Sequence, residues 1–364
     1  MKVAIVYDRV NKWGGAERVL LSLHEIFPDA SLYTSVYDEE KAKWAKVFPI
    51  VKTTYLQKFK FLRSRHELIP FLLPVFFEAY DFSDYDLVIS VTSEFAKGII
   101  TKPNTLHICY CLTPVRYLWS GYETYFENFF LRLISKPVVN YLRFWDLIAK
   151  DRPDFLISVS HTVKDRIERY YNRESIVIYP PIKTDLFNKS LTNFKKKFFL
   201  VVSRLVRYKR VDIAILACNK LNFPLIVVGT GSDYRRLKKM AGNNVKFLSY
   251  VSEETLCDLY KKAYALIFPG EEDFGLVIAE AQLSGTPVIA YGKGGALEIV
   301  NEKTGILVEQ QSVEAFCKAL EEFDYKKYDG EKIAMNAQKF SENRFRKEFL
   351  SFVKKCYSKK ILQF

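Results

Sequence analysis

Two carboxylates, Glu272 and Glu280, stand eight positions apart on either side of a glycine-containing loop. The apolar run 264–268 before them is typical of a strand buried in a parallel sheet, and Pro269-Gly270 ends that run. A helix is predicted from about residue 274 to residue 284, so Glu280 lies two turns into it, roughly 8 Å farther along the axis at about 1.5 Å per residue. Carboxylates accept hydrogen bonds from vicinal hydroxyls, and amides at a helix N-terminus favour a phosphate. A sugar nucleotide is long enough to contact both groups.

Positive charge follows an earlier predicted strand, in the segment Val202-Ser-Arg-Leu-Val-Arg-Tyr-Lys-Arg-Val211. Open α/β sheets bind ligands at the carboxyl ends of their strands. Positive charge at such a point suits an anionic ligand. The segment is therefore a candidate anion site, in which we expect Arg207 and Arg210 to be solvated neighbours.

The elements that position these groups alternate between strand and helix along the chain, which is typical of parallel α/β sheets. Strands are predicted at 3–7, 30–33, 87–91, 107–111, 155–159, 175–182, 198–203, 225–228, 245–248, 264–268, 288–291 and 306–308. With 364 residues, 49% of them hydrophobic, the chain can bury two cores, since a single core rarely exceeds roughly 250 residues. We expect a first domain over 1–190, a second over 191–340 and helical residues over 341–364. A helix over 127–148 is expected to break near Pro137.

The composition argues against several classes of protein. Six Cys, of which only Cys109 and Cys111 are closely spaced, give neither a disulfide framework nor a metal-binding pattern, which fits a reducing cytoplasm. No cluster of Asp, His or Cys has the spacing of metal ligands, so we expect neither a metal nor a cofactor. The chain opens with a strand pattern rather than a leader, and its best apolar run, 71–77, is too short to span a bilayer.

The net charge of +13 suits nucleic acid, an anionic small molecule or an acidic membrane surface. The segment 52–65 carries cations but no acid, and its aromatic residues are Tyr55, Phe59 and Phe61. Its cations are Lys52, Lys58, Lys60, Arg63 and Arg65. Cations mixed with aromatics favour a membrane interface, and the alternative is a loop whose aromatics pack inward. A nucleic-acid-binding protein is the rival class, but no nucleic-acid motif is present.

The spacing Glu272-x7-Glu280 within its Gly/Pro frame resembles the signature of retaining glycosyltransferases of family four. That resemblance implies the GT-B fold, in which two Rossmann-like, doubly wound parallel-sheet domains face each other across a cleft. It also implies that Glu272 contacts the donor sugar, that Glu280 holds the ribose hydroxyls, and that loop amides meet phosphate and sugar. The residues of that loop are Asp273, Phe274, Gly275 and Leu276.

Other positions follow the pattern of the same family. There an Arg, and a Lys five positions later, grip the diphosphate, which implies Arg204 and Lys209, with Ser203 where the family usually has Gly. The further donor-binding positions that the resemblance implies are Gly14 and Gly15 of the first loop, Gly229 of a glycine turn, Tyr250 and Val251 at the corner that meets the base, and Lys293. The Gly229 turn is equally well interpreted as purely structural, and Lys293 as a solvated side chain.

The segment Cys109-Tyr-Cys-Leu-Thr-Pro-Val-Arg-Tyr-Leu-Trp119 resembles the mannosyltransferases that extend bacterial O-antigen on a lipid carrier with GDP-mannose. That implies a GDP-mannose donor and a lipid-linked glycan acceptor, with Arg116 and Lys97 as candidate contacts for acceptor or phosphate. A structural ion pair is the alternative for Arg116. Those relatives usually carry a His where this chain has Leu112, which implies a slower enzyme, another residue in that role or a different sugar. His107, on the adjoining strand, is a weak replacement.

The resemblances together imply a retaining hexosyltransferase in the cytoplasm, peripheral on the inner face of the cell membrane, which it touches through 52–65. The departing diphosphate could itself accept the acceptor proton, so the catalytic candidates are Arg204, Lys209 and Glu272. The final helix of GT-B enzymes returns to the first domain, and we expect the same of 341–364. A UDP-sugar donor is the alternative to GDP-mannose.

Overall fold

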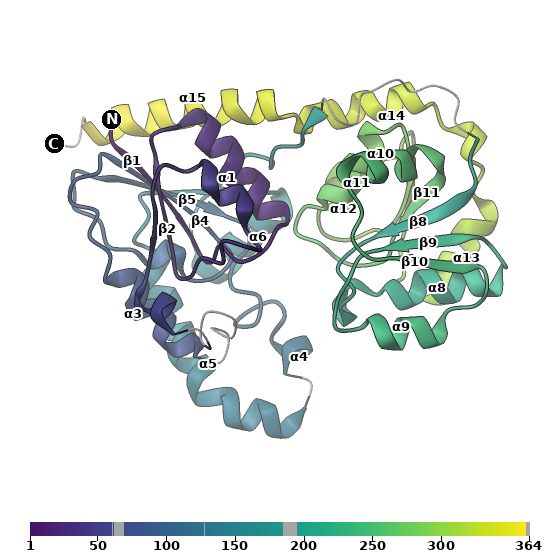
Figure 1. Ribbon diagram of the computed structural model, residues 1–364, viewed down its shortest axis with the longest axis horizontal. Coiled ribbons are helices and arrows are strands. Elements are labelled where there is room, and N and C mark those ends of the chain that lie inside the picture. Colours follow the sequence, from purple (N-terminus) through teal and green to yellow (C-terminus); the bar gives the residue numbers. More distant parts are fainter. Residues whose placement is uncertain (60, 62–68, 127, 185–194, 362–364) are drawn as a thin grey trace. The chain divides into compact units, whose positions relative to one another are not determined.

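The computed structural model describes residues 1–59, 61, 69–126, 128–184 and 195–361. The chain divides into two compact units (Figure 1). Unit 1 comprises Met1–Pro180 and Phe345–Phe364, and unit 2 comprises Pro181–Arg344. The C-terminal segment therefore belongs to the same unit as the N-terminus.

Unit 1 is built on a parallel sheet that has, among the described residues, seven strands in the order β3-β2-β1-β4-β5-β6-β7. The strands are β1 (Val3–Tyr7), β2 (Ser31–Thr34), β3 (Val51–Thr53), β4 (Leu87–Thr92), β5 (Leu106–Cys111), β6 (Phe155–Ser158) and β7 (Ile176–Val177). Their central members are rich in β-branched and aromatic residues and are fully buried, as strands covered on both faces must be. The strand order reverses between β1 and β4, which makes the carboxyl ends of these two strands a topological switch point.

Helices surround the sheet of unit 1 and connect its strands. The α-helices are α1 (Gly15–Ile26), α3 (Leu73–Glu78), α4 (Tyr122–Tyr125), α5 (Phe129–Ala149), α6 (His161–Tyr171) and α15 (Glu342–Ile361). The 3₁₀ helices are η1 (Lys43–Val47), η2 (Tyr55–Lys58), η4 (Pro70–Leu72) and η5 (Ala96–Gly98).

Helix α5 runs unbroken from Phe129 to Ala149 with Pro137 inside it, so the predicted break near Pro137 is wrong. Proline removes one backbone hydrogen bond from a helix, a cost of roughly 3 kcal/mol. Packing of the second half of the helix opposes that cost, because Leu142 and Trp145 are buried in the core of unit 1. Tertiary burial therefore outweighs the local signal of the proline.

Helix α15 packs on unit 1 from Phe345 onward. Phe345 and Phe349 are buried against the ring of Tyr110 on β5, at centroid distances of 5.9 and 6.5 Å. Near the end of the helix, Lys360 forms an ion pair with Asp154 at 2.5 Å. The helix is thus held at both ends of its contact with this unit.

Unit 2 is built on a second parallel sheet, which has among the described residues six strands in the order β10-β9-β8-β11-β12-β13. The strands are β8 (Phe198–Val202), β9 (Leu225–Val228), β10 (Val245–Leu248), β11 (Ala263–Phe268), β12 (Val288–Tyr291) and β13 (Gly305–Val308). The helices are α8 (Val211–Lys220), α9 (Tyr234–Met240), α10 (Glu253–Lys262), α11 (Leu276–Leu283), α12 (Ala296–Ile299), α13 (Val313–Glu322) and α14 (Gly330–Ala337), with η6 (Arg207–Lys209), η7 (Tyr325–Lys327) and η8 (Gln338–Phe340). The order reverses between β8 and β11, so this sheet has the same kind of switch point.

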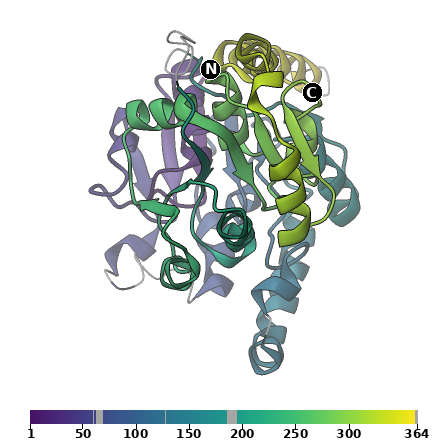
Figure 2. The ribbon, with the colours of Figure 1, turned by 90° about the vertical axis from the view of Figure 1, so that its right-hand side faces the viewer.

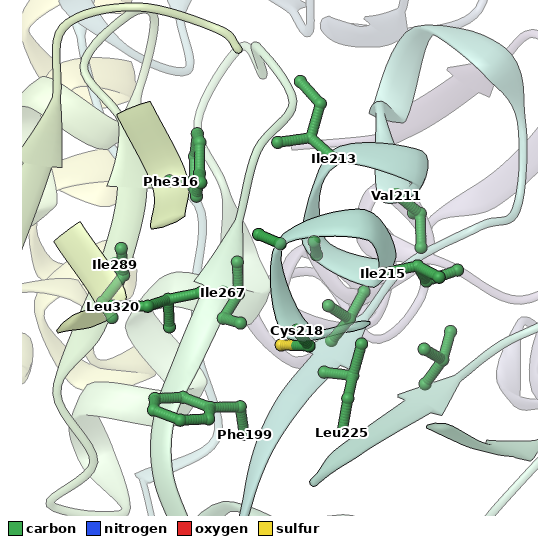
Figure 3. Close-up of a cluster of buried hydrophobic side chains, with 14 of the residues drawn as sticks. Phe199, Val211, Ile213, Ile215, Cys218, Leu225, Ile267, Ile289, Phe316 and Leu320 are labelled. Carbon is green, nitrogen blue, oxygen red and sulfur yellow. The ribbon is translucent and has the colours of Figure 1, made fainter. Parts of the chain in front are cut away.

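The core of unit 2 fills the space between its sheet and the helices α8 and α13 (Figure 3). Ile267 and Ile289 come from neighbouring strands, Cys218 comes from α8, and Phe316 and Leu320 come from α13. Helices cover both faces of this sheet (Figure 2). The two doubly wound parallel sheets confirm the predicted α/β architecture.

Candidate functional site

The loops after β8 and β11 bring Lys209 and Glu272 together at the switch point of unit 2. The ammonium of Lys209 forms an ion pair with Oε1 of Glu272, although the two residues lie 63 positions apart. Lys209 is nearly buried, with 8% of its side chain exposed, whereas 25% of the Glu272 side chain is exposed. The structure therefore joins a cation and a carboxylate that the sequence placed at the ends of two separate strands.

The backbone of Glu272 is fixed by the glycine-rich turn after β12. Gly295 donates its amide to the Glu272 carbonyl at 2.9 Å, and Gly294 forms a parallel bridge with Glu272. Gly294 has φ +64°, and a Cβ there would overlap the Glu272 carbonyl. Only glycine permits both that backbone conformation and that close approach. The turn thus sets the position from which the Glu272 side chain extends.

Helix α11 begins at Leu276, close to the predicted start near residue 274, with Gly275 as its N-cap at φ +97°. Because its N-cap is glycine, the capping residue has no side chain to offer the first backbone amides of the helix. Glu280 follows on the second turn and is buried, and Tyr260 of α10 donates its hydroxyl to Oε2 at 3.1 Å. The hydrogen bond from Tyr260 holds this carboxylate in one orientation.

Arg204 lies on the exposed side of the loop after β8. Its Nη2 donates to the hydroxyl of Tyr208 at 2.6 Å, and its carbonyl accepts the hydroxyl of Ser203 at 3.1 Å. Gly229, in the turn after β9, packs directly on the backbone of Ser203. That close contact supports the structural interpretation of the Gly229 turn.

The other predicted donor positions of unit 2 lie on the loops around this sheet edge. Tyr250 is 82% exposed and Val251 is half-buried, both just before α10. Lys293 is exposed, with its ammonium 5.7 Å from the centre of the Tyr291 ring. Phe274 packs inward against Phe340, so only its backbone could face a ligand. Asp273 is half-buried beside it.

In unit 1 the switch point between β1 and β4 is organised by one buried carboxylate, that of Asp8. Its Oδ1 accepts the hydroxyl of Thr92 at 2.8 Å and the amides of Phe95 and Ala96 at 2.9 Å each. Its Oδ2 accepts the amide of Ser93 at 2.8 Å. These hydrogen bonds fix the loop that follows β4 against the end of β1.

Arg9 and Glu94 form a bidentate ion pair at the same edge. The two guanidinium nitrogens donate to the two carboxylate oxygens of Glu94 at 3.1 and 2.7 Å. Burial raises the pKa of Glu94, and Arg9 opposes that shift. Gly14 and Gly15, which open α1 after β1, lie half-buried on this edge, with Gly14 as an uncapped N-cap.

Lys97 is buried and paired with Asp146 at 2.5 Å. Burial lowers the pKa of Lys97, but the charge of Asp146 outweighs that effect and the pKa is raised. Asp146 also accepts the indole N–H of Trp119 at 2.7 Å and the hydroxyl of Tyr171 at 2.9 Å. The buried ion pair favours a structural role for Lys97 over the predicted ligand contact.

His107 is completely buried, and its Nε2 lies 2.9 Å from the hydroxyl of Ser90. Burial lowers its pKa to about 3, so the ring is neutral at physiological pH. It is a packing residue rather than a replacement for the histidine that Leu112 displaces. Leu112 and Arg116 are half-buried in the segment that follows β5.

The stability of unit 1 is expected to fall between pH 7 and pH 5, in part through His107. The unfolded ring has a pKa of 6.5, so between 6.5 and 3 the unfolded chain binds a proton that the folded chain does not. The free energy of unfolding of unit 1 therefore falls by about 1.4 kcal/mol per pH unit below 6.5, or by about 2 kcal/mol at pH 5. Urea unfolding followed by tryptophan fluorescence reports on unit 1, because all four Trp residues lie there. His107→Gln should lose about 2 kcal/mol less than the parent, and equal losses in the two proteins would contradict the assignment.

Among the described residues, no group of three or more His, Cys, Asp or Glu is placed to hold a metal ion. In the same part of the chain, no helix combines the length and the apolar character that crossing a membrane requires.

Sequence reasoning missed the contacts that join distant segments of unit 1. Asp8 and Ser93 lie 85 positions apart, and Lys97 and Asp146 lie 49 positions apart. No local pattern links the members of these pairs. The sequence does place Asp8 and the segment 96–98 after predicted strands. Because the carboxyl ends of parallel strands lie at one edge of the sheet, that placement could have indicated that the two segments are close.

Residues 182–340 match the family model of glycosyl transferases group 1. Over 163 residues the chain is 35% identical to the O-antigen chain mannosyltransferase RfbU of Salmonella typhimurium, a match that covers 41% of this chain and 45% of that protein. Over 230 residues it is 31% identical to a probable sucrose-phosphate synthase of Thermosipho melanesiensis, 54% of each chain. The chain thus spans about half the length of these relatives.

The fold is similar to that of Anabaena Alr3699/HepE, solved in complex with UDP-glucose, with a TM-score of 0.71 and 19% sequence identity. This match covers 98% of the present chain and 100% of the other. The likeness confirms the predicted GT-B fold.

Proposed function

Because residues 182–340 match the family model of glycosyl transferases group 1, we propose that the protein transfers a hexose from a nucleotide sugar to a glycan acceptor with retention of configuration. The observation that carries the proposal is the Lys209–Glu272 pair at the switch point of unit 2. Open α/β sheets bind their ligands at such points. The pair places a cation for phosphate and a carboxylate for hydroxyl groups within reach of one donor.

In the proposed reaction the bond between the anomeric carbon and the phosphate oxygen breaks, and the diphosphate leaves with the electron pair. Arg204 and Lys209 stabilise the negative charge that builds on it. The acceptor hydroxyl oxygen bonds to the anomeric carbon on the same face of the sugar. Its proton passes to the departing phosphate oxygen, so no side-chain base is required. Glu272 and Glu280 then position the donor instead of acting as an acid/base pair.

We propose GDP-mannose as the donor and a lipid-linked glycan as the acceptor. Support for this choice comes from the match to RfbU and from the resemblance of the segment 109–119 to O-antigen mannosyltransferases. A UDP-sugar is the alternative, because HepE has been solved with UDP-glucose. A melting-temperature screen with GDP, UDP, their sugars and single-stranded DNA separates these possibilities. Stabilisation by DNA and by none of the nucleotides would overturn the enzymatic proposal.

Glu280→Gln is expected to weaken donor binding by about tenfold, because a charged acceptor for the ribose hydroxyls becomes neutral. The amide can still accept the Tyr260 hydroxyl, which limits the damage to the fold. Isothermal titration calorimetry with the nucleoside diphosphate measures the change in dissociation constant. Unchanged affinity in a variant that melts like the parent would contradict the ribose assignment.

We propose that the protein acts at the cytoplasmic face of the membrane, and that residues 52–65 contribute to its contact. Within the described part of this segment, Tyr55, Phe59 and Phe61 are exposed and only Leu56 is buried among the apolar side chains. This exposure favours the membrane interpretation over inward packing. Lys60, Arg63 and Arg65, which were part of the prediction, lie outside the described residues.

A further inference from the structure

Helix α5 carries an apolar stripe that faces away from unit 1 along most of its length. The stripe consists of Phe130, Ile134, Tyr141, Phe144 and Ile148, which are 71%, 75%, 44%, 68% and 48% exposed. These positions recur at whole helical turns, so they share one face of the helix. The first and last are 18 residues apart, which corresponds to about 27 Å of helix.

The opposite face of α5 is anchored in unit 1. Val139, Leu142, Trp145 and Ala149 are buried in its core, and the side chain of Asp146 is bound to Lys97. The exposed stripe therefore cannot turn inward without breaking that packing. The N-terminal half of the helix continues past the rest of unit 1 (Figures 1 and 2), and its Phe129 and Leu133 are also exposed, at 71% and 59%.

A second group of exposed apolar side chains lies on the neighbouring elements η4 and α3. Phe71 and Leu72 of η4 and Val75 of α3 are exposed, and η4 is in contact with α5. Exposed apolar side chains in this number mark a site of association with a protein or a membrane.

The charges around the stripe favour an anionic surface. Residues 128–145 contain no acid and three cations, Arg132, Lys136 and Arg143. Arg132 and Arg143 donate through Nε to the carbonyls of Phe126 and Leu118, so both are held at the side of the helix. In a symmetric dimer through this face, the same cations of two copies would meet, which is unfavourable. Anionic headgroups have the complementary charge.

We propose that the exposed face of α5, continued by η4 and α3, lies in the interfacial layer of an anionic phospholipid membrane. Phe130, Ile134 and Phe144 enter the boundary of the acyl chains, while Arg132 and Lys136 contact lipid phosphates. The inference rests on the proposed function for its membrane partner, and it names the element that enters the lipid. It assigns the main contact to α5 rather than to the segment 52–65.

Co-sedimentation with lipid vesicles tests the proposal with the full chain. The parent protein is expected to bind vesicles of phosphatidylcholine with roughly one-third phosphatidylglycerol, and to bind pure phosphatidylcholine at least about tenfold more weakly. The variant Phe130→Ser/Ile134→Ser/Phe144→Ser should lose at least about tenfold in vesicle affinity, because three apolar side chains no longer enter the lipid. The matched control is Leu297→Ser/Met335→Ser, which removes exposed apolar side chains from unit 2 and should bind like the parent.

A charge variant, Arg132→Gln/Lys136→Gln, should lose about fivefold per cation at low salt and less at high salt. A third variant, Phe59→Ser/Phe61→Ser, should change vesicle binding less than the α5 variants do. Unchanged vesicle binding by the α5 apolar variant would overturn the proposal. The proposal would also be overturned if the parent were a dimer, and if the α5 apolar variant were a monomer with unchanged vesicle binding. A second copy of the chain would then cover this face.

Nucleotide binding is measured on the same proteins by melting temperature. If no nucleotide binds but vesicle binding still depends on α5, the proposed function is overturned and the present inference stands. Loss of the α5 dependence alone would overturn only the present inference.

Discussion

Lys209→Met is expected to lower kcat/KM by about 100- to 1000-fold, the usual effect of removing one preorganised group that stabilises transition-state charge. The nearly buried ammonium lies at the end of η6 and is paired with Glu272. A bound diphosphate would pair with the ammonium in place of Glu272. The stabilisation that the ammonium gives to the diphosphate grows as the glycosidic bond breaks, because negative charge builds there. The rate is measured with the donor that the melting-temperature screen identifies. Chromatography quantifies the nucleoside diphosphate that the enzyme releases over time.

Arg207→Met is the matched control for this prediction. Arg207 lies in the same 3₁₀ helix as Lys209 but is exposed, so its loss should change kcat/KM by less than about threefold. A transition-state role requires that Lys209→Met lower kcat more than it raises KM. Equal losses in the two variants, or a Lys209→Met protein with parental activity, would remove Lys209 from the mechanism.

Breaking the buried ion pair in unit 1 is expected to destabilise that unit by about 3–5 kcal/mol, the usual cost of leaving one member of a buried pair alone. Lys97→Met leaves Asp146 charged, with the hydrogen bonds from Trp119 and Tyr171 but without its counter-charge. Asp146→Asn leaves the ammonium of Lys97 buried without its counter-charge. Urea unfolding followed by tryptophan fluorescence measures both losses in unit 1.

The double variant Lys97→Met/Asp146→Asn should lose less than the sum of the two single losses, because no isolated charge remains. Asp151→Asn is the control. Its carboxylate, which pairs with Lys150 and Arg173, is exposed, and its removal should cost less than about 1 kcal/mol. Additive losses in the double variant would show that the two charges do not stabilise each other.

The strands of both sheets follow from buried apolar runs, and most of them were predictable in place and order of occurrence. Helix α11 was equally predictable, because Gly275 and Ser284 mark its ends in the sequence. The strand β3 was missed because Val51–Thr53 is only three residues long and is half-exposed at the sheet edge. A short edge strand has too little hydrophobic pattern to be distinguished from a loop.

The candidate site was predictable in its parts but not in its contacts. Sequence places Lys209 and Glu272 after two different strands, and only the strand order β8-β11 makes them neighbours. Lys97 was a candidate ligand contact only through the resemblance to O-antigen mannosyltransferases. Its burial depends on Asp146, on a helix 49 positions later, and no local pattern predicts that partner.

The return of α15 to unit 1 makes unit 2 an insertion in the connectivity of unit 1. The two points where the chain enters and leaves unit 2 are tied together, since Ile182 donates its amide to the Phe340 carbonyl at 2.9 Å and pairs with Ser341. The ribosome therefore delivers every residue of unit 2 before the last segment of unit 1, which contains the buried Phe345 and Phe349. During synthesis the second unit can complete its fold first, and the first unit must keep an apolar groove open beside Tyr110 until the end of the chain emerges.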